Sequence, residues 1–141
     1  MPAFIRHGDP VAGVIDILTN QTPELAPYSI DNISGDLTGW DKTKTWIQVS
    51  REGGLRVWPK ISKPRIDIDV YAPTSNECAD IMDIVEASIF RAQYQYRGWG
   101  IRLHRVIEEV GPVEAYDKHE ESPRYFCSLR LTTTPDFESM P

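Results

Sequence analysis

Hydrophobic residues recur at helical spacing in two stretches of the chain. The first follows Asp9-Pro10, where Asp suits the N-cap and Pro the first helical position, and runs for about three turns. The second follows Thr74, whose spacing from Glu77 fits a capping box, and runs to about Ala92. Its apolar stripe consists of Cys78, Ile81, Met82, Val85 and Ile89. These patterns predict two amphipathic helices.

Strict alternation of apolar and polar residues predicts strands elsewhere. It is clearest in Arg65–Tyr71, where Ile66, Ile68 and Val70 share one face. The other predicted strands are 45–50 and 55–58, separated by a turn at 52–54, then 101–110 with a β-bulge near His104-Arg105, and 124–134. Residues 24–44 give no clear assignment beyond a short candidate strand at 28–33, and their order is left open.

This order of elements predicts an α+β fold: a mainly antiparallel or mixed sheet with two helices packed on one face. The length of 141 residues fits a single domain, 1–141. We expect an ordered core over about 9–135 and a short mobile C-terminal tail over 136–141.

Charge and composition narrow the classes of function. The net charge of −6 argues against a sequence-independent DNA or RNA binder, which needs clustered Lys and Arg. No apolar run is long enough for a membrane span, and the first residues lack a signal-peptide pattern, so we expect a cytosolic protein. Cys78 and Cys127 lie in apolar patterns and are expected to be buried, reduced thiols.

Candidate chemistry is sparse. Asp67 and Asp69 project from the same face of a strand and could hold a metal, but the polar side of an alternating strand has the same appearance. His7, His104 and His119 lie in no metal-ligand spacing, and no nucleophile or phosphate-binding motif occurs. We therefore predict no catalytic residues, no metal and no cofactor.

The four tryptophans are better candidates for function. Three of them, Trp40, Trp58 and Trp99, lie near predicted turns, and Trp46 lies on the strand face opposite Ile47. Aromatic residues are enriched in protein interfaces, although some also cover the ends of a core. We expect at least one of the four to be buried by a partner chain.

Residues 65–74 (RIDIDVYAPT), followed by 77–87 (ECADIMDIVEA), carry a family resemblance. An alternating strand, a small residue and a regular helix in this order resemble the centre of the tail terminator (tail completion) proteins of long-tailed bacteriophages. The N-terminal helix and the closing strand that ends at Pro135 fit the same outline.

The resemblance implies a structural protein of the virion neck, assembled in the host cytoplasm. Such proteins form a ring, usually a hexamer, on the head-proximal end of the tail tube; the ring stops tube polymerisation and joins the tail to a head-side connector or stopper protein. DNA would pass through without specific binding and would be repelled by acids in the lumen. Candidate lumen acids are Asp67, Asp69, Asp117, Glu120 and Glu121.

Three alternatives remain open from the sequence. One is another neck protein, such as a head-tail stopper or a head-completion protein. The second is a small metal-dependent hydrolase that uses Asp67, Asp69 and a histidine. The third is a monomeric binding module with a small-molecule pocket under the sheet.

Overall fold

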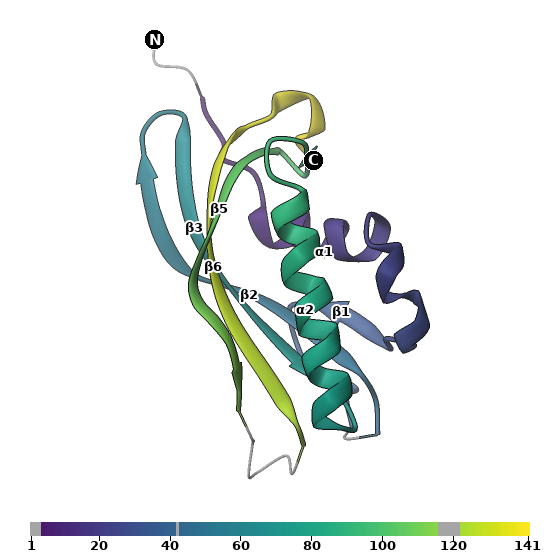
Figure 1. Cartoon of the computed structure of the whole chain (residues 1–141). Coiled ribbons are helices and arrows are strands. Elements are labelled where there is room, and N and C mark those ends of the chain that lie inside the picture. Colours follow the sequence, from purple (N-terminus) through teal and green to yellow (C-terminus); the bar gives the residue numbers. More distant parts are fainter. Residues whose placement is uncertain (1–3, 42, 116–121) are drawn as a thin grey trace.

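A computed structural model describes residues 4–41, 43–115 and 122–141. Its centre is a six-stranded sheet in the order β1-β2-β3-β6-β5-β4 (Figure 1). The strands are β1 (Asn32–Ser34), β2 (Trp46–Val57), β3 (Ile61–Tyr71), β4 (Arg97–Gly98), β5 (Ile101–Glu114) and β6 (Arg124–Pro135). β1 runs parallel to β2, and all other pairs are antiparallel. The predicted α+β class with a mixed sheet is therefore confirmed.

Both predicted helices are present with the expected caps. In α1 (Pro10–Asn20), the Asp9 carboxylate accepts a hydrogen bond from the Ala12 N–H at 3.1 Å. In α2 (Ser75–Arg91), the Thr74 hydroxyl accepts from the Glu77 N–H at 3.2 Å. These bonds satisfy N–H groups that the first helical turn leaves free, so each helix starts where its sequence dictates.

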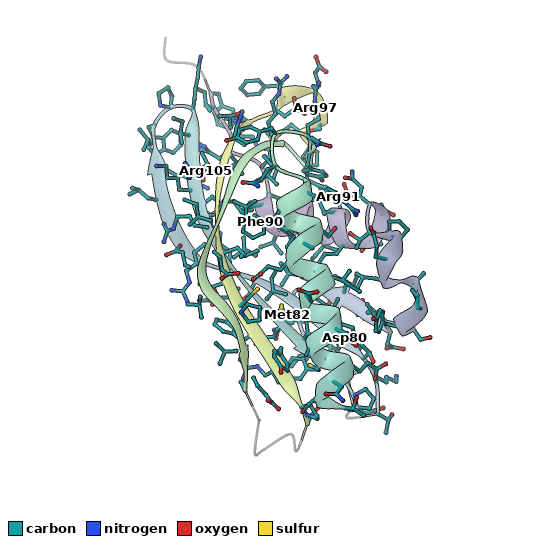
Figure 2. All side chains as sticks on the ribbon, viewed as in Figure 1. Asp80, Met82, Phe90, Arg91, Arg97 and Arg105 are labelled. Carbon is teal, nitrogen blue, oxygen red and sulfur yellow. The ribbon has the colours of Figure 1, made fainter. Side chains whose placement is uncertain are left out.

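The core joins both helices to the sheet. The α2 stripe from Cys78 to Ile89 is fully buried, and Met82 points from the helix toward the strands (Figure 2). The predicted apolar face of β3 is also fully buried, and β6 adds Cys127, Leu129 and Leu131. Both cysteines are unbridged, and burial raises the pKa of Cys78 to about 11 and that of Cys127 to about 12. As expected, they are packing residues.

The predicted turn at residues 52–54 is wrong. β2 continues through it as one strand, and the hairpin turns instead after Val57, where Trp58-Pro59 is a cis peptide. Gly53 and Gly54 have φ of +77° and +119°, and the β2–β3 register shifts between Arg51 and Gly54. Glycine tolerates these angles, so the Gly-Gly pair forms a bulge in place of a turn.

β5 contains the predicted bulge, because its register with β6 shifts between Leu103 and Arg105. The strand does not end at Val110 as expected. A further shift between Val110 and Val113 accommodates Gly111-Pro112, and pairing with β6 continues to Glu114. Proline can occupy such a bulge because its missing N–H removes no regular ladder bond there.

The two remaining segments also acquire structure. Within 24–44, a 3₁₀ helix, η1 (Pro23–Tyr28), precedes β1, so the candidate strand at 28–33 is correct only at its end. The C-terminal residues differ from the expected mobile tail: they form η2 (Phe137–Ser139), and Arg97 binds the buried Asp136 carboxylate at 2.8 and 3.0 Å. This bidentate pair lowers the pKa of Asp136 to about 2.

Candidate assembly surfaces

The β2–β3 hairpin exposes apolar side chains next to basic ones. Beyond the Gly53-Gly54 bulge it projects from the body of the molecule (Figure 1). We call its tip the hairpin surface: Leu55, Arg56, Val57, Trp58, Lys60 and Ile61. The four apolar members are all exposed, and Trp58 retains 61% of its accessible area. Exposing these apolar groups to water is unfavourable, and a cluster of them is typical of a protein contact surface.

The N-terminal segment contacts the hairpin surface through His7. The His7 ring packs edge-on against Trp58 with centroids 4.4 Å apart, and the Arg56 guanidinium lies 5.9 Å from the centre of the same indole. His7 is buried, and neither ring nitrogen has a hydrogen-bond partner within the described residues. Burial, reinforced by Arg56 and Arg51, lowers the pKa of His7. The imidazole is therefore a neutral spacer that orients Trp58.

A second exposed apolar row lies on β5. Ile107, Val110 and Val113 are each more than one-third exposed. Acidic side chains alternate with them, and we call the combined set the β5 strip: Ile107, Glu108, Glu109, Val110, Val113 and Glu114. The strip combines apolar area with acidic groups, of which Glu109 forms an ion pair with Arg130 of β6.

The β5 strip follows a sheet edge without a neighbouring strand. β4 pairs only with Ile101 and Arg102, and the Gln93 side chain then accepts a hydrogen bond from the Val106 N–H at 2.8 Å. Past this point, the part of the chain that the structure describes provides no outer partner for β5. A long unpaired edge is a template for pairing with another chain.

A carboxyl pair flanks the strip. Glu86 on α2 faces Glu108, and one Glu86 oxygen is buried without a hydrogen-bond partner in the described residues. Burial, then the interaction with Glu108 and the charge of Asp83, raises the pKa of Glu86 to about 7. Burial and the nearby carboxylates therefore disfavour the charged form of Glu86.

The tryptophans divide into two groups. Trp46 is buried and donates to the Asp36 carbonyl at 2.9 Å, whereas Trp40 packs on Tyr71 and donates to the Lys44 carbonyl at 3.1 Å. Both of these side chains contribute to the subunit's own packing. Trp58 and Trp99 are exposed and remain interface candidates.

Asp67 and Asp69 are nearly buried and lie next to arginines. Arg65 donates to Asp67 at 3.1 Å, and Arg124 donates to Asp69 at 2.7 Å. Burial raises the pKa of Asp69 in spite of the attraction of Arg124. Because each carboxylate is compensated within the subunit, neither is a strong source of repulsion for passing DNA. Asp117, Glu120 and Glu121 lie outside the described residues.

The geometry gives no support to a metal site. His7 is buried against Trp58, His104 contacts the Thr134 hydroxyl at 2.7 Å, and His119 lies outside the described residues. Within the described ranges, no group of three or more His, Cys, Asp or Glu could hold an ion. The same ranges contain no helix with the length and hydropathy needed to cross a membrane.

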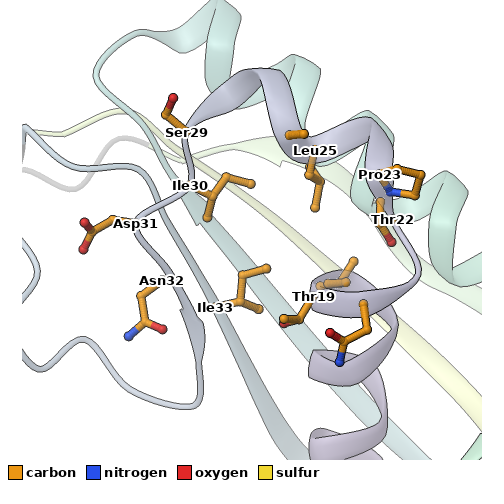
Figure 3. A pocket seen from close by; sticks show the side chains of 12 residues that line it. Thr19, Thr22, Pro23, Leu25, Ser29, Ile30, Asp31, Asn32 and Ile33 are labelled. Carbon is orange, nitrogen blue, oxygen red and sulfur yellow. The ribbon is translucent and has the colours of Figure 1, made fainter.

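A groove of about 700 Å³ lies between α1, η1 and β1, beside the sheet edge. Leu25, Ile30 and Ile33 point into it, with Thr19 and Asn32 at its margins (Figure 3). The groove lies beside the edge strand β1, whereas the alternative of a monomeric binding module places its pocket under the sheet. Sequence reasoning missed the groove because residues 24–44 have no regular period.

The sequence matches no protein-family model and no curated protein.

Proposed function

We propose that this chain is a non-enzymatic, self-assembling subunit of a bacteriophage neck, specifically a tail terminator. The observation that carries the proposal is the concentration of exposed large apolar side chains on the hairpin surface and the β5 strip. Contiguous apolar patches of this kind mark protein contacts. A cyclic ring needs two different patches on each subunit, and the chain offers two.

The fold is compatible with that role. Residues of α1, α2, β3 and β6 share one apolar core, which supports an arrangement with both helices on one face of the sheet. The strand–small residue–helix unit at 65–87, on which the family resemblance rests, is present as β3, Ala72 and α2. In this role the ring, a hexamer by family resemblance, caps the tail tube, contacts the head-side connector or stopper, and lets DNA pass without specific binding.

The first test is the particle mass of the purified protein by light scattering, with negative-stain images of the protein mixed with tail tubes of the same phage. A terminator gives rings and a cap at one end of each tube. Rings that bind only the portal side would assign the chain to a stopper or head-completion role. A monomer that leaves tube ends bare at every concentration would refute the proposal. Bound metal, together with a hydrolytic activity that the Asp69→Ala substitution abolishes, would favour the metal-dependent hydrolase.

A further inference from the structure

Both free edges of the sheet carry long unpaired sections, on strands that are not neighbours. β1 covers only Trp46–Gln48 of β2, so β2 has no outer neighbour through the hairpin within the described residues. β5 has none beyond Val106, as described above. The hairpin surface, on β2 and β3, and the β5 strip are therefore separated by β6 in the order of the sheet.

The two sections have opposite charge. Residues 51–63 contain four basic groups, Arg51, Arg56, Lys60 and Lys63, and one acid, Glu52, for a net charge of 4 − 1 = +3. Residues 107–114 contain three glutamates and no basic group, for a net charge of −3. Glu109 forms an ion pair with Arg130 of β6, so Glu108 and Glu114 are the acids available to a basic partner. The protein as a whole is acidic, so the basic hairpin is a local exception. Complementary potentials of this kind steer two surfaces together and fix their register.

The apolar groups also correspond. The hairpin surface presents Leu55, Val57 and Ile61, and the β5 strip presents Ile107, Val110 and Val113. Each surface therefore has three aliphatic side chains between charges, and contact would remove both sets from water. Strand edges can in addition exchange backbone hydrogen bonds.

From the charge match and the free edges, we propose that the hairpin surface of one copy docks on the β5 strip of a second copy. This inference rests on the self-assembly in the proposed function and names its interface. The contact is heterologous, because two different patches meet, so it propagates from copy to copy and closes into a ring or extends as a filament. Arg56 and Lys60 face Glu108 and Glu114 in this contact.

Charge reversal tests the pairing. We would prepare a hairpin variant, R56E/K60E, a strip variant, E108K/E114K, and a chain carrying all four substitutions. Each two-site variant should associate about 100-fold more weakly than wild type, because like charges then meet. The four-site chain should assemble again, since both signs are reversed together. An equimolar mixture of the two variants should yield a complex of only two copies, formed by the intact hairpin of one and the intact strip of the other.

The control is K44E/D80K, which reverses one basic and one acidic group away from both surfaces; Asp80 points into solvent from α2 (Figure 2). It should assemble like wild type in sedimentation measurements at physiological salt. Circular dichroism checks that all variants fold, and recovery in the four-site chain separates lost contact from lost folding.

The outcomes distinguish this inference from the proposed function. Variants that assemble and cap tubes like wild type would overturn the interface and leave the terminator role standing. Charge-dependent assembly without capping would support the interface and refute the terminator role. Three outcomes would overturn the inference. The mixture of the two variants could form no two-copy complex, or the four-site chain could stay monomeric. The wild-type protein could also be monomeric, with a hairpin that binds duplex DNA.

Discussion

Replacing Glu86 with Gln should stabilise the protein at pH 8.5 and change little at pH 4.5. Glu86 faces Glu108, and its pKa is raised from 4.5 to about 7. A raised carboxyl pKa means that the folded state binds the proton more tightly than the unfolded chain. The stability penalty is therefore absent below pH 4.5 and complete above pH 7. The full shift corresponds to about 3.4 kcal/mol, and solvent screening at this partly exposed pair reduces it to about 1–2 kcal/mol.

The assay is urea unfolding at both pH values, in a concentration range where the protein is monomeric. Glu108→Gln should give a smaller gain, because it removes the repulsion from Glu108 but leaves the burial of Glu86 unchanged. Asp80→Asn, on the exposed face of the same helix, removes one negative charge without touching the pair and should shift the free energy of unfolding by less than about 0.5 kcal/mol. A Glu86→Gln gain of equal size at both pH values would refute the reasoning, as would a loss at pH 8.5.

Three further outcomes follow from the contacts. Met82→Ala should lower the free energy of unfolding by about 2–5 kcal/mol in denaturant titrations, because Met82 is fully buried and its loss leaves a cavity. Asp136→Asn should weaken the bond between Arg97 and the C-terminal residues. The Gly100 N–H donates to the Ser139 hydroxyl, so its amide exchange should become faster in this variant. Unchanged exchange at Gly100 would contradict the docking of the C-terminal residues. His7→Phe should remove the part of the stability loss that develops as pH falls below about 6.5, because the lowered pKa of His7 disfavours its protonation in the folded state. Identical acid-unfolding curves for the His7→Phe variant and wild type would contradict the neutral-spacer role.

The elements that sequence reasoning predicted correctly are those with local signals. Capping residues set both helix starts, and strict alternation identified β3 and β6. The errors occurred where one local signal has two meanings. Gly53-Gly54 permits a turn or a bulge, and only cross-strand pairing with residues 61–66 decides between them. The docked C-terminal tail depends on Arg97, a contact 39 residues away that no local pattern reveals.

The assembly surfaces were only partly predictable. The sequence identified Trp58 and Trp99 as interface candidates, and both are exposed, but Trp46 and Trp40 pack within the subunit. Gly111-Pro112 is typical of a strand end, so the sequence pattern does not indicate that the β5 strip continues beyond Val110. Exposed apolar residues on an edge resemble ordinary strand residues until the order of the sheet shows that no neighbour covers them.

The structure also changes the interpretation of the polar face of β3. Burial raises the pKa of Asp69 despite Arg124, so desolvation outweighs attraction and the pair adds little to stability. The Arg124–Asp69 hydrogen bond and the bond from Arg65 to the buried Ser128 at 2.7 Å both join β3 to β6, and together they fix one register between the two strands. A slip of one residue would turn the apolar face of β3 outward. β3 continues into the hairpin, and β6 pairs with β5. The buried charges therefore fix the position of the hairpin surface relative to the β5 strip, which a repeating assembly requires to be the same in every copy.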